Sequence, residues 1–299
     1  MGFNRPDLLD QCLNSIVGTL NSKIYVHIDG PRQKKELQDM NKIERIREII
    51  SEYEKKIRIE TNFQSVNLGI RRSVPFAVDW VLKENDSVIV IEDDLIPSPH
   101  ALKFCMDALV LYEENPEIGA ISGFAHPSPD LAYKRDSDVH LSIIPESYMW
   151  ATWKHKWINY SDEIFLKESL KNMFEFSGIG DWKFKLIWQL RALQAKLGLV
   201  DTWAYRWVFS LWQYKKFCIG PNYPISVYKG EVEGTHTLGN YKKKLVADRF
   251  YPILRLNIKV SDYDKNIDLI YAKKYLGLSI LGILQLLGET LILYIKKKK

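Results

Sequence analysis

The sequence has few cysteines, no internal repeat and no low-complexity segment. Its 299 residues include three cysteines, Cys12, Cys105 and Cys218, which stand far apart. This spacing matches no metal site, and the small number suits a reducing compartment. The opening residues run directly into a helical pattern at Pro6, so we expect no signal peptide.

A large excess of one charge is also missing. The net charge is +5, and much of it lies in the four lysines that end the chain, Lys296–Lys299. Nucleic acid is therefore not an expected partner. With 46% hydrophobic and 26% charged residues, the composition is that of a globular protein, either one large α/β domain or one domain with an appendage.

The strongest chemical signal is an apolar run that ends in acids. Residues 87–91 read Ser-Val-Ile-Val-Ile, and Glu92, Asp93 and Asp94 follow at once. Such a run predicts a strand buried on both faces in a parallel sheet. Because unpaired buried carboxylates are costly, the acids are expected at the strand's carboxyl end, where open α/β sheets bind ligands. Clustered carboxylates there suit Mg²⁺ or Mn²⁺, although a solvated acidic turn is the alternative.

Helices and strands alternate along the chain before and after this run. Their order over residues 24–91 is βαβαβ, which implies a parallel sheet with right-handed crossovers, and almost no room for a strand precedes Pro6. The predicted strands are 24–28, 56–61, 87–91, 119–123 and a short one near 218–221. The predicted helices are 7–20, 33–53, one that the loop 67–72 opens and that runs to about 83, 100–115, 162–176, 181–197 and one that begins near Trp203.

The last segment differs from the rest. Residues 275–295 are mostly Leu, Ile and Gly, and Glu289 lies among them. The length approaches that of a membrane span, but a helix in the plane of the membrane, held by lysines to anionic lipid, fits Glu289 better. The alternative is a helix packed on the domain or on a second subunit.

Several short motifs occur in one order, namely Phe3–Pro6, Asp29–Arg32, Asn67–Gly69, Glu92–Pro99, Ile121–Gly123 and Thr235–Thr237. In these motifs the sequence resembles the inverting GT-A glycosyltransferases, in particular the N-acetylglucosaminyltransferase I type (glycosyltransferase family 13) and its bacterial relatives. The resemblance implies an α/β fold of GT-A type, with a Rossmann-like, mostly parallel sheet flanked by helices. It divides the chain into a nucleotide-sugar-binding half (1–125), an acceptor-binding half (126–260) and a helical, membrane-associating tail (261–299).

The resemblance also implies roles for single residues. Asp94 is expected to bind Mn²⁺ (or Mg²⁺), and Glu92 and Asp93 to lie against the ribose and sugar of the donor. Asp29 is expected to hold the uracil and Arg5 to lie near the nucleotide. The implied reaction transfers a sugar from a UDP-sugar, with UDP-N-acetylglucosamine as first candidate, to a glycan or lipid-linked acceptor. The implied setting is synthesis of lipopolysaccharide or capsule at the cytoplasmic face of the membrane.

An inverting transfer also needs a general base for the acceptor hydroxyl. The family carries this acid between two tryptophans ahead of a Cys-Ile-x-Pro stretch. Cys218–Pro221 matches that stretch, but no acid stands between Trp203 and Trp207. Asp201 is our first candidate, and a helix N-cap is its alternative role. The other candidates are Glu146, Asp181 and Glu231.

Further site candidates each have a structural alternative. His236 is a candidate ligand of the diphosphate or metal, or simply a loop residue. Arg71, with Arg72, opens a helix near the expected donor and either faces phosphate or is a solvated helix start. Trp150 and Trp153, with Trp157, either line the acceptor groove or lie in the core.

Two other functions compete with sugar transfer. A nucleotidyltransferase would share a related sheet, but it needs a glycine-rich N-terminal loop with a basic residue, and Gly2 stands alone there. The second is a catalytically degenerate module that binds nucleotide or glycan without turnover. The missing acid between Trp203 and Trp207 and the very short first strand favour this second alternative.

Overall fold

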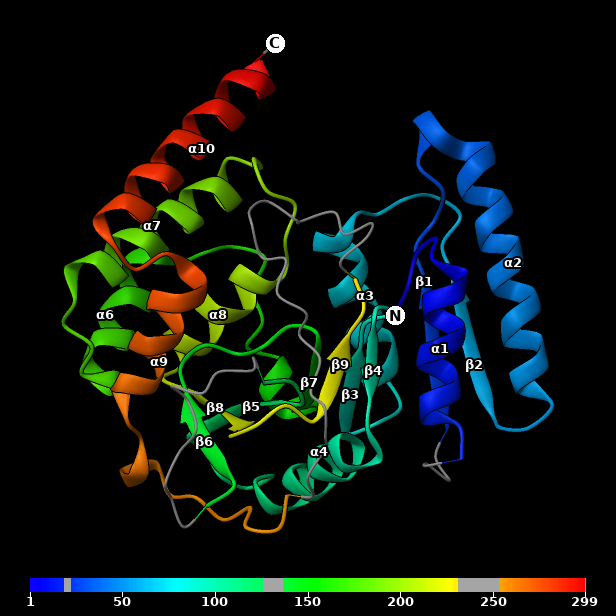
Figure 1. Cartoon of the computed structure of the whole chain (residues 1–299), viewed down its shortest axis with the longest axis horizontal. Coiled ribbons are helices and arrows are strands. Elements are labelled where there is room, and N and C mark those ends of the chain that lie inside the picture. The colour runs from blue at the N-terminus through cyan, green and yellow to red at the C-terminus, as the bar shows by residue number, and fades with distance from the viewer. Residues whose placement is uncertain (19–22, 126–136, 231–252, 299) are drawn as a thin grey trace.

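The computed structural model describes residues 1–18, 23–125, 137–230 and 253–298. The fold is mixed α/β, with a central five-stranded sheet between helices (Figure 1). The strand order in this sheet is β3-β7-β5-β8-β6. These strands are β3 (Ser87–Ile91), β5 (Ile118–Ser122), β6 (Val139–Ser142), β7 (Met149–Trp153) and β8 (Phe217–Pro221).

A separate unit forms the N-terminal end of the molecule (Figure 1). In it β1 (Ile24–Ile28) and β2 (Ile59–Phe63) pair in parallel, and α1 (Pro6–Ile16) and α2 (Glu36–Glu54) lie against them, with a short 3₁₀ turn (Gln33–Lys35) before α2. The unit buries a hydrophobic cluster of its own, made of Leu9, Leu13, Val26, Ile28, Ile43, Ile46, Ile49 and Ile50.

The first two residues join this unit to the central sheet. Gly2 accepts a hydrogen bond from the Asp29 amide (3.1 Å) and donates one to the His27 carbonyl (2.9 Å). The amino group of Met1 donates to the Ile91 carbonyl at the end of β3 (2.8 Å). An extended segment of two residues therefore lies between β1 and β3, in place of a longer strand.

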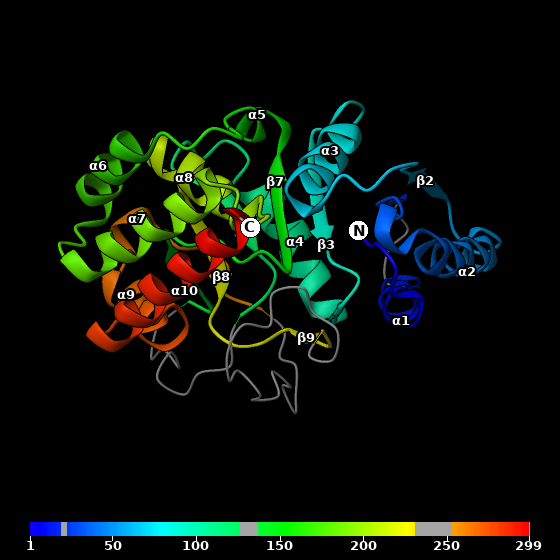
Figure 2. The same cartoon turned by 90° about the horizontal axis from the view of Figure 1, so that it is seen from above.

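Helices cover both faces of the central sheet. On one face lie α3 (Ile70–Leu82) and α8 (Ala204–Gln213), and on the other lies α4 (Pro99–Leu111), whose N-cap Ser98 accepts from the Ala101 amide. More helices gather on the side of the molecule opposite the N-terminal unit (Figures 1 and 2). They are α6 (Leu166–Ser177), α7 (Trp182–Lys196), α9 (Lys265–Tyr271) and α10 (Ile280–Lys298).

The remaining elements are short. The strands β4 (Leu95–Pro97) and β9 (Ser226–Tyr228) pair antiparallel beside the end of β3. Helix α5 (Lys154–Trp157) follows β7, a 3₁₀ turn (Val260–Asp262) precedes α9, and one π-helical turn (Ala272–Leu276) joins α9 towards α10.

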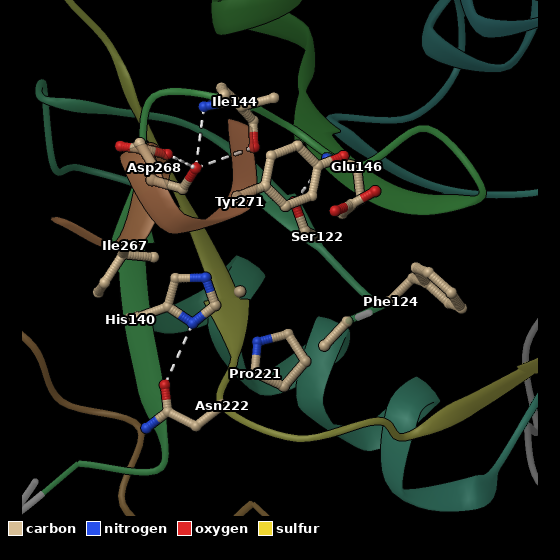
Figure 3. A pocket seen from close by; sticks show the side chains of 13 residues that line it. Ser122, Phe124, His140, Ile144, Glu146, Pro221, Asn222, Ile267, Asp268 and Tyr271 are labelled. Carbon is tan, nitrogen blue, oxygen red and sulfur yellow. Dashed lines mark hydrogen bonds between the residues drawn. The ribbon is translucent and has the colours of Figure 1, made fainter. Parts of the chain in front are cut away.

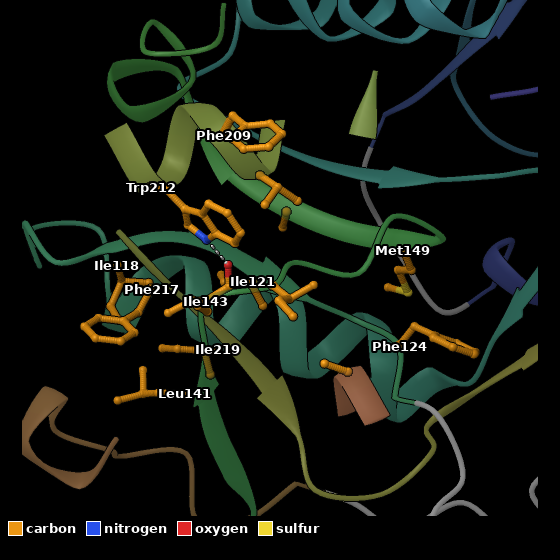
Figure 4. Close-up of a cluster of buried hydrophobic side chains, with 14 of the residues drawn as sticks. Ile118, Ile121, Phe124, Leu141, Ile143, Met149, Phe209, Trp212, Phe217 and Ile219 are labelled. Atoms are coloured by element: carbon orange, nitrogen blue, oxygen red, sulfur yellow. Dashed lines mark hydrogen bonds between the residues drawn. The ribbon is translucent and has the colours of Figure 1, made fainter. Parts of the chain in front are cut away.

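The main core fills the space between the sheet and its helices (Figure 4). Trp212 of α8 is fully buried there and its Nε1 donates to the Ile143 carbonyl (2.7 Å). A second cluster on the other face contains Trp150, Trp157, Trp203 and Trp207, in which the rings of Trp150 and Trp203 stack with centroids 5.0 Å apart. The aromatic richness of the chain is thus largely core material.

The central sheet corrects two predictions. It is not mostly parallel, because β7 runs antiparallel to both β3 and β5, and β6 is antiparallel to β8, which leaves β5–β8 as its parallel pair. Nor is β3 buried on both faces: it lies at the edge of this sheet, and Val90 alone of its five residues is buried. Still, β3, β5 and β8 point the same way, so their carboxyl ends share one edge, where ligands bind in such sheets.

Candidate functional site at the carboxyl edge of the sheet

Asp93 and Asp94 follow β3 at this edge and enclose a basic side chain. They are 1% and 5% exposed, respectively. The Arg5 guanidinium reaches both: Nη1 donates to Asp94 Oδ2 (2.7 Å), Nε donates to Asp93 Oδ2 (3.3 Å), and Nη2 contacts Asp93 Oδ1 closely. Burial disfavours the charge of Arg5, but Asp93 and Asp94 outweigh this effect and raise its pKa.

One carboxylate oxygen of this group is left without a partner. Asp94 Oδ1 is buried and has no hydrogen bond among the described residues. A β-carbon added at Gly230 would lie 2.6 Å from Asp94 Oδ2 and 2.3 Å from Tyr228 Oη. The chain after β9 therefore passes directly beside the carboxylate, at a distance that only glycine permits.

Glu92 lies at the start of the same turn. Its amide donates to the Tyr148 carbonyl (3.1 Å), which fixes the end of β3 against the start of β7. Burial, with Asp94 and Asp93 nearby, raises the pKa of Glu92 to about 8. Burial likewise raises the pKa of Asp93. Two buried carboxylates, Asp93 and Asp94, thus face a single guanidinium, and a site with this excess of negative charge attracts a cation.

Asp29 follows β1 at the neighbouring edge and holds a loop in place. Its Oδ1 accepts from the amides of Gly30 (2.9 Å) and Leu68 (2.8 Å), and its Oδ2 accepts from the Gly69 amide (3.1 Å) and Asn67 Nδ2 (3.2 Å). Burial raises the pKa of Asp29, and the three amides oppose that shift. In this structure Asp29 positions the loop before α3. Its contact with the uracil ring of a nucleotide stays a prediction.

Asp201 lies against the same loop. Gly69 has a φ of +75°, a region that favours glycine, and a β-carbon there would lie 2.6 Å from Asp201 Oδ2. Asp201 does not cap α8, because the N-cap residue is Trp203 and the Ala204 amide donates to Thr202 Oγ1 (3.2 Å). Its side chain is exposed, beside the N-terminus of α3.

The basic residues around Asp201 are engaged by another acid. Arg71 at the start of α3 forms a two-point ion pair with Asp162, in which Arg71 Nε donates to Asp162 Oδ1 (2.9 Å). Arg206, which stands between the two tryptophans, is buried and donates to the carbonyls of Asp162 (2.9 Å) and Thr202 (2.7 Å). Where the family carries an acid, this chain therefore has an inward-pointing cation with a structural role.

Two predicted acceptor residues are corrected. Trp150 and Trp153 are 0% and 1% exposed, so neither presents a ring face to a ligand. Trp150 lies in the tryptophan cluster under α3 and α8, and Trp153 Nε1 donates to the Leu109 carbonyl (2.9 Å). Trp157 is also buried, at 5%. The alternative, that these tryptophans belong to the core, is the one observed.

Two of the other candidates for the general base lie away from Asp201. Asp181 caps α7, since its Oδ1 accepts from the Lys183 amide (2.7 Å). Glu146 lines a cavity of about 40 Å³ between the sheet edge and α9, together with Ser122, His140 and Tyr271 (Figure 3). This volume holds water molecules but is far smaller than pockets that enclose a small molecule. Glu231 and His236 lie outside the described residues.

The comparisons with known proteins give a distant likeness. No protein family and no curated protein matches the sequence. Among solved structures, a mannosyltransferase from Pyrobaculum calidifontis, in complex with GDP-Man and Mn²⁺, is similar over 72% of this chain and 68% of its own, with 11% identity and a TM-score of 0.41. A likeness this distant carries no information about residues or reaction.

The carboxylate of Asp94 suits a divalent cation that binds together with a diphosphate. The described residues contain no group of three or more His, Cys, Asp or Glu side chains arranged to hold a metal. Asp94 nevertheless offers a buried carboxylate oxygen that has no hydrogen-bond partner in the described part of the chain. Because Mg²⁺ and Mn²⁺ commonly take one or two carboxylates and complete their shell with phosphate oxygens and water, Asp94 with a diphosphate meets their needs.

Proposed function

We propose that the chain is a metal-dependent glycosyltransferase that uses a nucleoside diphosphate sugar. The observation that carries the proposal is the unpartnered oxygen of Asp94, buried beside Asp93 at the edge where β3, β5 and β8 end. A buried carboxylate oxygen without a donor is costly unless a cation or a donor group satisfies it. A divalent ion there would stabilise the negative charge that develops on a departing diphosphate.

The residues around Asp94 would do the positioning. Arg5 holds the carboxylates of Asp93 and Asp94 apart in a fixed geometry through three hydrogen bonds. Asp29 fixes the Asn67–Gly69 loop at the start of α3, and a helix N-terminus favours negative charge. The nucleotide would lie between these two groups, which belong to different sheets.

The finer parts of the proposal rest on the sequence resemblance. They are an inverting reaction, UDP-N-acetylglucosamine as donor, and a glycan or lipid-linked acceptor in surface polysaccharide synthesis. Inversion requires a base on the acceptor side, and we propose Asp201 for it. The exposure of Asp201 beside the loop that Asp29 holds supports the choice, since the carboxylate is open to solvent and to an incoming hydroxyl.

The test is calorimetric titration with UDP, GDP and their sugars, with and without Mn²⁺. We expect one nucleotide sugar to bind in a metal-dependent manner, and Asp94→Ala to abolish that dependence because it removes the proposed carboxylate ligand. Asp107→Ala, which removes an exposed acid paired with Lys103 on α4, is the matched control and should bind normally. If no nucleotide binds under either condition, the transferase proposal fails.

A degenerate binding module is the second candidate. The observation in its favour is Arg206, which occupies the segment between Trp203 and Trp207 and makes only structural contacts in the described part of the chain. Under this alternative a nucleotide sugar would still bind at Asp94, but no sugar would be released or transferred. Incubation with radiolabelled donor and detection of free or transferred sugar separates the two.

A further inference from the structure

Helix α10 uses one face to dock on the protein. Ile283, Leu286 and Thr290 are buried, and Gln194 of α7 donates through Nε2 to Thr290 Oγ1 (2.8 Å). At the far end Lys297 Nζ donates to the Leu197 carbonyl just after α7 (2.6 Å). These contacts fix how the helix is rotated about its axis, and they decide which side chains point outwards.

The opposite face of α10 is apolar and exposed. At 3.6 residues per turn its outward positions form one stripe. Seven side chains of this stripe are 42% to 76% exposed, and they are Ile280, Leu281, Leu284, Leu287, Leu291, Ile292 and Ile295. We call these seven residues the α10 stripe. No charged residue interrupts it, and a helix that is apolar on both faces normally has both covered.

Helix α10 and the helix packed on its docked face carry a strong excess of positive charge. Helix α7 and residues 272–298 together contain nine lysines and arginines and a single acid, Glu289. This excess exceeds the net charge of +5 for the whole chain, so the remainder of the molecule is net negative. Lysines stand at both ends of the stripe, with Lys273 and Lys274 before it and Lys296 and Lys298 after it.

We propose that the α10 stripe docks on an anionic lipid surface, with the helix lying in the plane of the membrane. The seven apolar side chains would enter the boundary between headgroups and acyl chains, and the flanking lysines would meet the anionic headgroups. This proposal is independent of the reaction proposed for Asp94, because none of its residues touches that site.

The docked face argues against a membrane span. By length and composition no single helix in the described segments is suited to cross a membrane, whereas Lys265–Leu276 and Ile280–Lys298 taken together are, with a bend of 54° between them. A span through α10 would bring the basic residues Arg191 and Lys196 of α7 to the hydrocarbon, because α7 is packed along it. An in-plane helix keeps them at the headgroups.

Self-association through the same stripe is disfavoured by charge. Two copies that joined their α10 stripes would face each other with their basic surfaces, and like charges at close range repel. An anionic membrane offers the complementary sign together with an apolar layer. The observations therefore favour lipid as the occupant.

The test is sedimentation of the full chain with phosphatidylcholine vesicles, with and without phosphatidylglycerol. We expect binding that needs the anionic lipid and weakens with salt. The double variant Leu284→Glu, Leu291→Glu should weaken binding by more than about tenfold, and Lys296→Gln by about fivefold. Because both leucines are exposed, circular dichroism should show an unchanged fold.

The matched control places the same two substitutions elsewhere. Leu37 and Leu254 are 75% and 79% exposed and lie outside the stripe, so Leu37→Glu, Leu254→Glu should bind vesicles normally. The proposal is overturned if the chain ignores anionic vesicles, or if the stripe variant binds as tightly as the control. It is also overturned if the unmodified chain does not bind vesicles and light scattering shows a dimer that dissociates in the stripe variant.

Discussion

Arg5 is the residue on which the acidic site depends. It shares its single positive charge between two carboxylates that are almost fully buried, and it does so from the start of α1, far from β3 in sequence. Removal of one partner of a buried ion pair leaves an uncompensated charge, which costs much more than an exposed pair contributes. A cation that binds at Asp94 must therefore share that carboxylate with Arg5, so metal affinity depends on how firmly Arg5 is held.

At the residue scale the proposed base gives a direct prediction. Asp201→Asn should lower kcat by about 10²- to 10⁴-fold, because the acceptor proton loses its recipient. Donor binding should still depend on Mn²⁺, since Asp201 lies against Gly69 and not beside Asp94. Steady-state kinetics combined with donor titration check both halves. A full loss of turnover in Glu146→Gln, with Asp201→Asn active, would assign the base to the cavity of Figure 3 instead.

Sequence reasoning reached some of these residues and not others. The positions of Asp29, Asp93 and Asp94 at strand ends followed from apolar runs that end in acids, a local signal. The contact between Arg5 and Asp93 joins residues 88 positions apart and has no local signal. Trp150 and Trp153 were open to both interpretations, because an aromatic side chain looks the same in a core and in a sugar-binding groove.

At the scale of elements, α9 is attached to the sheet by a buried carboxylate. Asp268 accepts from Ser142 Oγ (2.5 Å), the Ile143 amide (3.2 Å) and Tyr263 Oη (2.8 Å), and it is 1% exposed. Burial raises the pKa of Asp268 to about 6 from 3.8, and these hydrogen bonds moderate the shift. The stability of the contact between α9 and the sheet consequently depends on pH.

The sign of that sensitivity follows from proton binding. Between about pH 4 and 6 the folded chain holds a proton on Asp268 that the unfolded chain has lost, so the free energy of unfolding falls as the pH rises. The fall amounts to at most about 3 kcal/mol. Asp268→Asn should remove it, which urea unfolding at several pH values would measure. Parallel pH profiles of the two proteins would contradict the assignment.

Some elements were predicted closely, and others were missed. The predicted strand 24–28 is β1 to the residue, the predicted helix 181–197 matches α7 closely, and the helix predicted to run to about 83 ends within one residue of α3. The strand β7 was missed, because its Met-Trp-Ala-Thr-Trp run has one β-branched residue and no alternation to reveal it, whereas the equally buried β5 was predicted at 119–123. Without β7 the antiparallel pairing of the central sheet could not be foreseen.

At the scale of the whole molecule, the proposed site lies on the boundary between two cores. Arg5 and Asp29 belong to the N-terminal unit with its own cluster, and Asp93 and Asp94 belong to the central sheet. The connections that cross this boundary include the extended segment at Gly2, the loop held by Asp29, the ion pairs of Arg5, and the contact of Cys12 and Ile16 of α1 with the main core. Strand β1 also contacts α3, since His27 Nε2 lies 2.9 Å from Ser73 Oγ and the rings of Tyr25 and Trp80 pack edge to face.

A unit with its own core can open while the rest stays folded. Amide hydrogens of β1 and of the inner face of α2 should therefore exchange with deuterium as one group, earlier than those of β5 and β8. A nucleotide sugar with Mn²⁺ would touch both sides of the boundary and should slow the exchange of that group selectively. Mass spectrometry of peptides from residues 24–54 measures this, and simultaneous exchange with the central sheet would contradict it. Ligand affinity would then be set partly by how often the N-terminal unit detaches.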